Sequence, residues 1–299
     1  RRVLFRSISA AWHLTLKGHT AVLFDTGDTL GGKISSVIPG SRIPKKTLKA
    51  ELNRVKKVIS NIKLNQEVNN TEFLKIKYDY DFTIVAAGSK RSRSLPVPGI
   101  ERAVFANDFL ESSKKDQSVP GKKVVIIGAG NVGCDVATEA HRLGAEEVTM
   151  IDVQEPAAFG KEKEDAQSIG AIFRWPCFTK KITKKGVVLQ DGEFLKADTV
   201  VISIGDIPDL DFLDETITLE NGFITVDQFN RTSDPRVFAI GDVVGPGLIT
   251  DAIGAGRRAA LNIDRIIGGK TPDLGEILPQ VDKQRISLEY YNPRNNADN

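Results

Sequence analysis

The sequence predicts an α/β protein with largely parallel sheets. Helical and strand patterns alternate along almost the whole chain, and this alternation is typical of strands joined by crossover helices. The 299 residues are enough for about two domains, each with a core of its own. Hydrophobic residues make up 40% of the chain and charged residues 27%, a composition that excludes a disordered or fibrous protein.

The first part of the chain contains the elements of one such unit. A helix is predicted over residues 9–17, and a short apolar strand that ends in an acid follows at 21–25. Paired glycines and prolines make 31–44 loop-like. The spacing of apolar residues predicts a helix over 45–62, and an apolar strand follows at 82–87.

A second unit is expected to begin after residues 112–123, whose Lys, Ser, Pro and Gly residues are typical of a crossing between domains. The elements predicted beyond it alternate in the same way: strand 124–127, helix 131–143, strand 148–152, and shorter strands at 186–189 and 199–204. A return crossing is expected near 230–235. The last predicted elements are a strand at 237–240 and a helix over 251–267.

The strongest local signal is the sequence Gly-Ala-Gly-Asn-Val-Gly at 128–133, which follows a buried strand and opens a helix. The first glycine permits a tight turn, the second lets a pyrophosphate approach the backbone, and the third lets the helix lie close to the strand. The amino end of the helix offers free N–H groups to the anion. Asp152 ends the next strand, 19 residues after Gly133, where a carboxylate accepts hydrogen bonds from an adenosine ribose. The pattern predicts a dinucleotide site, and a glycine-rich turn used only for packing is the alternative.

Two further acids end predicted strands but carry weaker signals. Asp25 ends the first strand, yet the glycine pattern expected about 20 residues upstream of such an acid is absent from positions 1–6. Taken alone, Asp25 is more typical of a solvent-facing strand end. The pair Gly241-Asp242 follows the strand at 237–240, and taken alone it is a turn in which Asp242 caps a helix.

Charge and cysteine content argue against several other functions. The 41 Lys and Arg residues nearly balance the 39 Asp and Glu residues, so net charge does not favour nucleic acid or an anionic membrane as partner. No apolar run approaches the roughly 18 residues of a membrane-spanning helix. The two cysteines, Cys134 and Cys177, form no CxxC pair, which favours a packing role for each and a reducing, cytoplasmic location. The chain has three histidines besides these two cysteines, too few ligands in no metal-binding spacing, so no zinc or iron–sulfur site built by this chain is expected.

Five stretches, taken in their order, resemble the flavoprotein reductases with two dinucleotide-binding domains, and most closely the small subunit of glutamate synthase. They are GGKISSVIPGSRIP at 31–44, TIVAAGSK at 83–90, GAGNVGCD at 128–135, VISIGDIPD at 201–209, and FAIGDVVG with DAIGAGRRAA within 238–260. The resemblance implies two Rossmann-like domains. In this arrangement an NAD(P)H-binding domain at 113–233 is inserted into a discontinuous FAD-binding domain at 1–112 and 234–299. The missing thiol pair excludes the disulfide-reducing branch of the same superfamily.

The resemblance also implies where each cofactor would bind. Asp25 would hold the adenosine ribose of FAD, and Asp242 would hydrogen-bond its ribityl chain. The other residues implied along FAD are Gly31, Gly32, Lys33, Arg42, Ala87, Gly88 and Gly241, with the backbone of Thr250, Asp251 and Ala252 facing the flavin ring from a helix amino end. The residues implied around the nicotinamide dinucleotide are Gly128, Gly130, Asn131, Val132, Gly133, Asp152 and Gly205.

By this resemblance the protein is an NAD(P)H-dependent oxidoreductase that passes hydride to FAD and electrons onward to an iron–sulfur domain or partner subunit. NADH is expected to be preferred to NADPH, because the strand leads into Asp152-Val153-Gln154 rather than into arginines. No side chain is expected to act as a catalytic acid, base or nucleophile. One alternative is a flavin monooxygenase-like or quinone-reducing enzyme, and another is a non-catalytic nucleotide-binding subunit of a larger complex.

Both ends of the chain differ from the pattern that the resemblance implies. The only methionine is Met150, and positions 1–6 read Arg-Arg-Val-Leu-Phe-Arg where the first glycine loop of an FAD domain is expected. We therefore expect a chain truncated at its amino end, and also at its carboxyl end, where it stops in polar residues. Because the N–H groups of that loop normally neutralise the FAD pyrophosphate, the chain as given is expected to hold FAD weakly.

Overall fold

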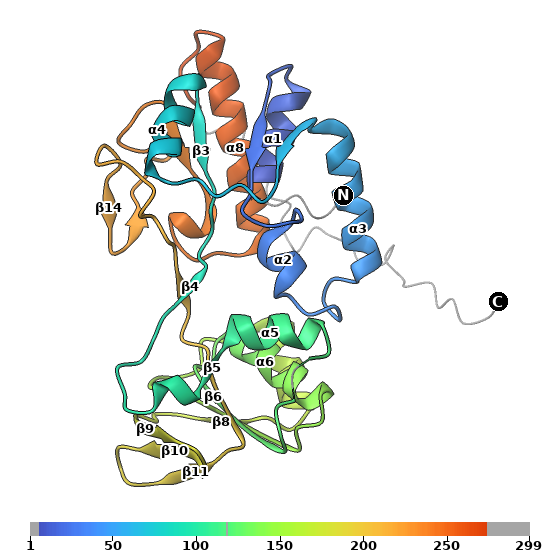
Figure 1. Ribbon diagram of the computed structural model, residues 1–299, viewed down its shortest axis with the longest axis vertical. Helices are drawn as coiled ribbons and strands as arrows, with labels where there is room; N and C mark the ends of the chain where they lie inside the picture. Colours follow the sequence, from blue (N-terminus) through green and yellow to red (C-terminus); the bar gives the residue numbers. More distant parts are fainter. Residues whose placement is uncertain (1–5, 118, 274–299) are drawn as a thin grey trace, which may run out of the picture.

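A five-stranded parallel sheet is the centre of the lower lobe in Figure 1. In the computed structural model, which describes residues 6–117 and 119–273, its strands follow the spatial order β5, β12, β6, β7 and β8. Their bounds are Val104–Phe105 (β5), Lys123–Ile127 (β6), Glu147–Ile151 (β7), Ile172–Arg174 (β8) and Thr199–Ile202 (β12). Every neighbouring pair is parallel, so the carboxyl ends of the strands meet at one edge of the sheet.

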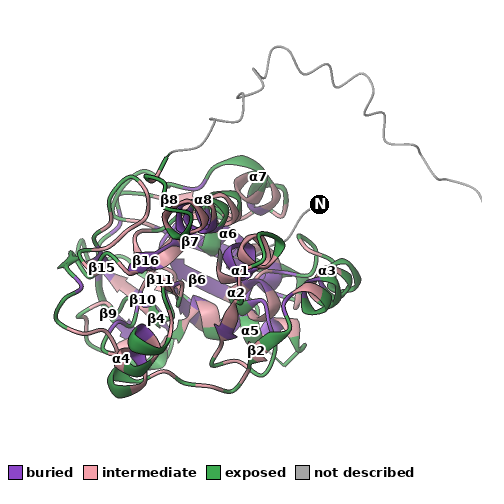
Figure 2. Cartoon of the chain, turned by 90° about the horizontal axis from the view of Figure 1, so that it is seen from above, coloured by how far each residue is buried: buried purple, intermediate pink, exposed green. Residues whose placement is uncertain are grey.

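Different layers cover the two faces of this sheet. Val124 and Ile126 face helices, whereas Val125 and Ile127 face a three-stranded antiparallel sheet, because successive side chains of a strand point to opposite faces. The helices are α5 (Ala106–Lys114), α6 (Asn131–Arg142) and α7 (Gly160–Ser168), and the antiparallel strands are β9 (Thr179–Thr183), β10 (Gly186–Leu189) and β11 (Phe194–Lys196). Figure 2 shows the buried residues gathered in the middle of the molecule, inside outer faces that are largely exposed.

The upper lobe contains two pairs of parallel strands (Figure 1). β1 (Val22–Phe24) pairs with β2 (Asn61–Lys63), and β3 (Thr83–Val85) pairs with β16 (Val237–Ala239). The helices of this lobe are α1 (Arg6–Leu16), α2 (Gly32–Ser36), α3 (Lys45–Val58), α4 (Asn70–Asp79), the short 3₁₀ turn η2 (Gly241–Val243) and α8 (Ile249–Ile267). Within the described ranges, no helix combines the length and the apolar character needed to cross a membrane.

Helix α1 connects the two strand pairs of the upper lobe. Its Ile8 and Ala11 pack in one cluster with Leu23 of β1, while Ala10 packs in another cluster with Phe238 of β16. Opposite sides of a single helix therefore bury apolar surface from both pairs, and this burial holds the halves of the lobe together.

The chain passes between the lobes along two adjacent strands. β4 (Arg91–Ser92) leaves the upper lobe and pairs in antiparallel fashion with β13 (Asp206–Ile207), which returns to it. Both crossings come earlier than the boundaries expected from the sequence at 112/113 and 233/234. Strand β5 and helix α5 already pack in the lower lobe, and the hairpin of β14 (Leu219–Glu220) and β15 (Phe223–Ile224) lies in a stretch that packs against the upper lobe. Within the described residues, 112–114 end α5 and Lys123 begins β6, so this polar stretch connects two elements of the lower lobe rather than two domains.

Two short elements, α2 and β2, contradict the sequence predictions, and the helices α4, α5 and α7 lie where no helix is predicted. Helix α2 lies within 31–44, which the sequence predicts as a loop, and β2 lies at the end of the helix predicted over 45–62. The helix stops at Val58 because Ile59 adopts an extended backbone and is 1% exposed in the core of the lobe. The three-residue strand β2 is stabilised by its pairing with β1. Because β1 lies in another part of the chain, the apolar periodicity of 45–62 does not predict this pairing.

A buried lysine fixes the returning segment to the upper lobe. Lys77 of α4 is 4% exposed, and its Nζ lies 2.5 Å from Asp214 Oδ2 and 2.8 Å from Asp234 Oδ2. Burial opposes the charged form, yet the hydrogen bonds and charges of the two carboxylates outweigh it and raise the pKa of Lys77. Against the same burial, hydrogen bonds from Lys77 help to hold the pKa of each carboxyl group below its usual range.

Replacing Lys77 with Met should lower the free energy of unfolding by about 3–5 kcal/mol, because two mostly buried carboxylates then lose their shared cation. Lys75→Met, at an exposed position of the same helix, is the matched control and should change that free energy by less than about 0.5 kcal/mol. Denaturant unfolding followed by circular dichroism measures both variants. Equal stabilities of the two variants would contradict the structural role of Lys77.

Candidate functional site

Two glycines shape the loop between β6 and α6, at the carboxyl edge of the lower sheet. Gly128 has a φ of +107°, and a Cβ placed there would lie 2.2 Å from the carbonyl oxygen of Ser203. A Cβ at Gly133 would lie 2.4 Å from the carbonyl oxygen of Gly128. Both positions therefore require glycine, the first for the turn and the second for the close packing of α6 on the strand.

Gly130 differs from these two glycines because the packing of the protein does not require it. A Cβ placed on Gly130 meets nothing within 4 Å. The residue directly precedes α6, and no side chain of the described structure caps the amino end of this helix. An open backbone beside uncapped helix N–H groups fits the pyrophosphate of a dinucleotide.

Two polar side chains hold the glycine loop in place. Asp152 directly follows β7, and its Oδ2 accepts a hydrogen bond of 2.8 Å from the N–H of Ala129. Asn131 accepts a hydrogen bond of 3.0 Å from the N–H of Phe159, which connects the start of α6 to the segment before α7. The two residues that the sequence singles out beside the glycines thus also order the loop itself.

A second group of sequence-predicted residues gathers at the carboxyl edge of the upper lobe. Because β3 and β16 are parallel, Gly88 and Asp242 follow them at the same edge. Ser89 Oγ donates to Asp242 Oδ2 at 3.5 Å, and Lys33 Nζ donates to Ser89 Oγ at 3.3 Å. Gly88 has a φ of +74°, and a Cβ there would meet nothing within 4 Å. This open backbone beside Asp242 fits a cofactor that bears phosphate and hydroxyl groups.

The other residues predicted to contact FAD lie on separate elements of the upper lobe. Asp25 follows β1 and accepts a hydrogen bond of 2.8 Å from the N–H of Gly27. Residues 250–252 lie in the first turn of α8, where Asp251 Oδ2 accepts a hydrogen bond of 3.0 Å from the N–H of Leu248. Positions 1–5, which hold most of the expected first glycine loop, lie outside the described residues. The FAD contacts of all these residues stay predictions.

Lys33 forms its ion pair with a carboxylate that the sequence analysis did not single out. Asp206 on β13 accepts a hydrogen bond of 2.6 Å from Lys33 Nζ. Ser92 Oγ and Asn107 Nδ2 donate to its other oxygen at 2.8 and 2.9 Å. Although burial opposes ionisation, these donors hold the pKa of Asp206 below its usual range. Asp206 directly follows Gly205 within the VISIGDIPD stretch, so the motif itself contained the signal.

Arg42 reaches from the upper lobe to two helices of the lower lobe. Its Nη1 lies 2.8 Å from Asp135 Oδ2 in α6, and its Nη2 forms an ion pair with Glu162 in α7. Burial raises the pKa of Asp135 to about 6, although Arg42 opposes this shift. The sequence analysis missed both carboxylates, because Arg42 and Asp135 are 93 positions apart and no local pattern connects them.

Both cysteines are free and lie in the core of the lower lobe. Cys134 in α6 is 0% exposed, and Cys177, which follows β8, is 8% exposed. Burial raises the pKa of Cys134 to about 12 and also raises the pKa of Cys177. Thiols kept protonated in an apolar interior are poor nucleophiles, as the packing role expected for them requires.

Residues 7–256 match the family model described as pyridine nucleotide-disulphide oxidoreductase. The chain is 32% identical to the NADP(+)-dependent formate dehydrogenase subunit beta of Moorella thermoacetica, over 87% of this chain and 42% of that protein. It is 31% identical to the NAD-dependent dihydropyrimidine dehydrogenase subunit PreT of Escherichia coli K12, over 88% of this chain and 66% of the relative. It is 27% identical to the glutamate synthase [NADPH] small chain of Mycobacterium tuberculosis H37Rv, over 88% of this chain and 65% of that protein. The chain thus spans less than two thirds of the length of these relatives.

Solved structures with a similar fold include a thioredoxin reductase of T. acidophilum. It matches with a TM-score of 0.68 and 22% identity, over 86% of this chain and 93% of that one. The reduced CoADR-RHD of Bacillus anthracis matches with a TM-score of 0.69 and 20% identity, over 89% of this chain and 55% of that one. These likenesses confirm the predicted fold, an α/β chain with Rossmann-like lobes.

Alanine at Gly130 and at Gly133 should separate dinucleotide binding from folding. Gly133→Ala should lower the free energy of unfolding by about 1–3 kcal/mol, because its methyl group would overlap the Gly128 carbonyl. Gly130→Ala should change this free energy by less than about 1 kcal/mol. The methyl group of Gly130→Ala should also weaken NADH binding by about tenfold or more, because it would fill the space expected for the pyrophosphate. Denaturant unfolding and fluorescence titration with NADH measure the two effects, and unchanged NADH affinity in Gly130→Ala would contradict the site.

Proposed function

Because the chain belongs to the pyridine nucleotide-disulphide oxidoreductase family, we propose that it is the flavin-reducing part of an NADH-dependent oxidoreductase. The family implies FAD and a pyridine nucleotide as cofactors. When bound, FAD would accept hydride from the nicotinamide and release electrons to an acceptor. The single observation that carries the proposal is the loop before α6, in which Gly130 leaves the backbone open beside the uncapped amino end of the helix.

The lower lobe would bind and orient the nicotinamide dinucleotide. The N–H groups at the start of α6, from Asn131, Val132 and Gly133, would face the pyrophosphate. The carboxylate of Asp152 would accept hydrogen bonds from the adenosine ribose, while its contact with Ala129 keeps the loop in shape. Gly205, which has a φ of +93° and open space around it, would leave room for the nicotinamide half near the crossing strand.

The upper lobe would bind FAD along the carboxyl edge of its strands. Asp25 after β1 would hold the adenosine ribose, and Asp242 after β16 would hold the ribityl chain. The open backbone of Ala87 and Gly88 would pass beside the pyrophosphate, with Gly31, Gly32, Lys33 and Gly241 nearby. The first turn of α8 would direct its N–H groups to the flavin ring and favour an anionic reduced form.

The protein itself would supply binding and orientation rather than acid–base chemistry. Both thiols are buried with raised pKa values, so a route for electrons through Cys134 or Cys177 is not supported. We infer that electrons leave to an iron–sulfur domain or partner subunit. The partner subunit is supported by the names of three relatives, each of which is one subunit or chain of a larger enzyme. The iron–sulfur acceptor is what the resemblance to the small subunit of glutamate synthase implies.

Anaerobic stopped-flow absorbance on the FAD-supplemented protein tests the proposed function. Mixing with NADH should bleach the flavin absorbance bands, and an added one-electron dye should restore them. NADH binding without reduction of protein-bound flavin would instead identify a non-catalytic nucleotide-binding subunit. Rapid oxygen consumption with a hydroxylated product would identify a monooxygenase.

We propose that the protein prefers NADH to NADPH, because Asp152 would lie opposite the 2′-phosphate of NADPH. One relative is named as NADP(+)-dependent and another as NAD-dependent, so their names do not decide between the two nucleotides. The preference for NADH is therefore inferred from Asp152 of this chain. Asp152→Asn keeps an oxygen acceptor for the Ala129 N–H but removes the negative charge. This variant should reduce the NADH preference by about tenfold in flavin-reduction kinetics. A wild-type protein that prefers NADPH, or a variant with unchanged discrimination, would refute the assignment.

Replacing both Cys134 and Cys177 with Ser should leave electron transfer from NADH to a dye largely intact. The expected cost is in stability, at most a few kcal/mol, because a hydroxyl then occupies each packed apolar position. Dye-reduction rates and denaturant unfolding on the double variant measure the two quantities. A folded double variant whose flavin is reduced but no longer reoxidised would show that a thiol takes part.

A further inference from the structure

Few backbone residues connect the two lobes, but side-chain contacts add to this connection. β4 and β13 are each two residues long, and they carry both passages of the chain between the lobes. A hinge of this size leaves the relative orientation of the lobes to contacts outside it. The segment 32–42, which includes α2, provides such contacts directly above α5 and α6 in Figure 1.

Arg42 holds two helices of the lower lobe at once. Its side chain is 34% exposed, while those of Asp135 and Glu162 are 10% and 16% exposed. Partners this well shielded from water interact more strongly than an ion pair on an open surface. Asp135 lies in the first turns of α6, the helix that follows the glycine loop, and Glu162 lies in the first turn of α7.

Two independent contacts fix the same segment. Lys114 at the end of α5 donates to the carbonyl oxygens of Ile34 and Ser35 at 2.9 and 2.8 Å, where α2 ends. Val37, which follows α2, is 9% exposed and packs in the core cluster that α5 and α6 form in the lower lobe. The segment therefore belongs to the upper lobe by sequence and is anchored in the lower lobe by packing.

We propose that Arg42 is a positioning residue that clamps α6 and α7 to the upper lobe and thereby sets the distance between the nicotinamide and flavin sites. Hydride transfer requires the reacting atoms to lie about 3–3.5 Å apart, so a small change in lobe orientation is enough to slow it. This consequence for catalysis rests on the proposed function, whereas the clamp itself does not. The role differs from the contact with the flavin nucleotide that the resemblance implies for Arg42.

Burial and two neighbouring carboxylates oppose the ionised form of Asp135, whereas Arg42 favours it. Arg42 from the loop before α3, Glu162 from α7 and Glu139 from α6 itself are the charged groups that act on Asp135. Lys114 of α5 lies near Glu139. With the pKa of Asp135 at about 6, its carboxylate is ionised and able to pair with Arg42 above that pH.

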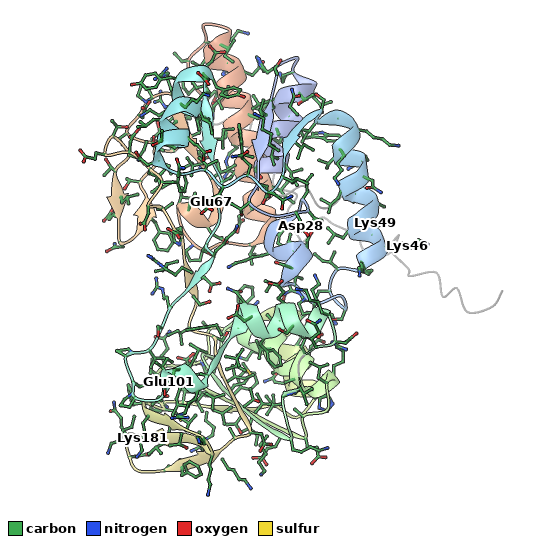
Figure 3. The ribbon with its side chains drawn as sticks, viewed as in Figure 1. Asp28, Lys46, Lys49, Glu67, Glu101 and Lys181 are labelled. Atoms are coloured by element: carbon green, nitrogen blue, oxygen red, sulfur yellow. The ribbon has the colours of Figure 1, made fainter. Side chains whose placement is uncertain are left out.

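A distance measurement between the lobes tests the clamp without any cofactor. Lys49 on α3 and Lys181 on β9 are both exposed and lie on different lobes, as Figure 3 shows. Nitroxide labels on Lys49→Cys and Lys181→Cys report the interlobe distance by double electron–electron resonance, and the buried native cysteines remain unlabelled. Arg42→Gln should broaden the distance distribution and shift it to longer values. Arg42→Lys, which can still pair with one carboxylate, should recover part of the narrow distribution.

Arg231→Gln is the matched control. Arg231 is also 34% exposed and forms an ion pair of 2.9 Å with Asp227, but both residues lie in the upper lobe. This variant should keep the wild-type distance distribution. A distribution unchanged in Arg42→Gln would overturn the clamp, whatever the activity of the variant.

Flavin reduction by NADH then tests the consequence for positioning. Arg42→Gln should lower kcat by about ten- to a hundredfold and leave KM within about threefold, because binding in each lobe is intact and alignment is lost. A broadened distribution with normal kcat would overturn the positioning role. If no variant, the wild type included, reduces flavin while the distances change as expected, the proposed function fails and the clamp is supported.

Discussion

The relative position of the two lobes depends on a few buried or shielded charges, because the backbone passes between them along only two short strands in the described residues. Arg42, Lys33 and Lys114 each extend from one side of this joint to acceptors on the other side or on the joint itself. Charge-assisted hydrogen bonds are directional, so they fix an orientation that apolar packing alone would leave adjustable. A reaction between two cofactors bound in different lobes would depend on that orientation.

The same principle explains how the chain returns to the upper lobe after the insertion. Lys77 connects Asp214 and Asp234 to α4, so the segment between β13 and β16 is held at a single buried cation. A lysine buried with two carboxylates is stable only when all three groups are present, because each would otherwise lack a partner in a water-poor environment. The discontinuous upper lobe is thus closed by an interaction between residues far apart in the chain.

The glycines of the loop before α6 differ in whether the packing of the protein requires them. Gly128 and Gly133 are required by the protein's own backbone, since a Cβ at either position would overlap a carbonyl oxygen. A Cβ at Gly130 would overlap no protein atom, so the packing of the protein does not require glycine there. In the proposed complex, the missing side chain would leave room for the dinucleotide. Asp152 likewise orders the loop through Ala129 and, in the proposed complex, would receive the ribose. Structural and binding requirements therefore meet in one turn of the chain.

The sequence by itself determined the α/β class, the glycine loop with Asp152, and most of the longer helices and strands. These features depend on local patterns: apolar periodicity, and glycines at fixed spacing between a strand and a helix. Tertiary structure alone decided where the chain crosses between lobes, because an edge strand such as β5 is two residues long and is defined only by its pairing with β12. It also decided the partners of Arg42 and Lys33, since Asp135, Glu162 and Asp206 come close to them only when the two lobes are folded against each other.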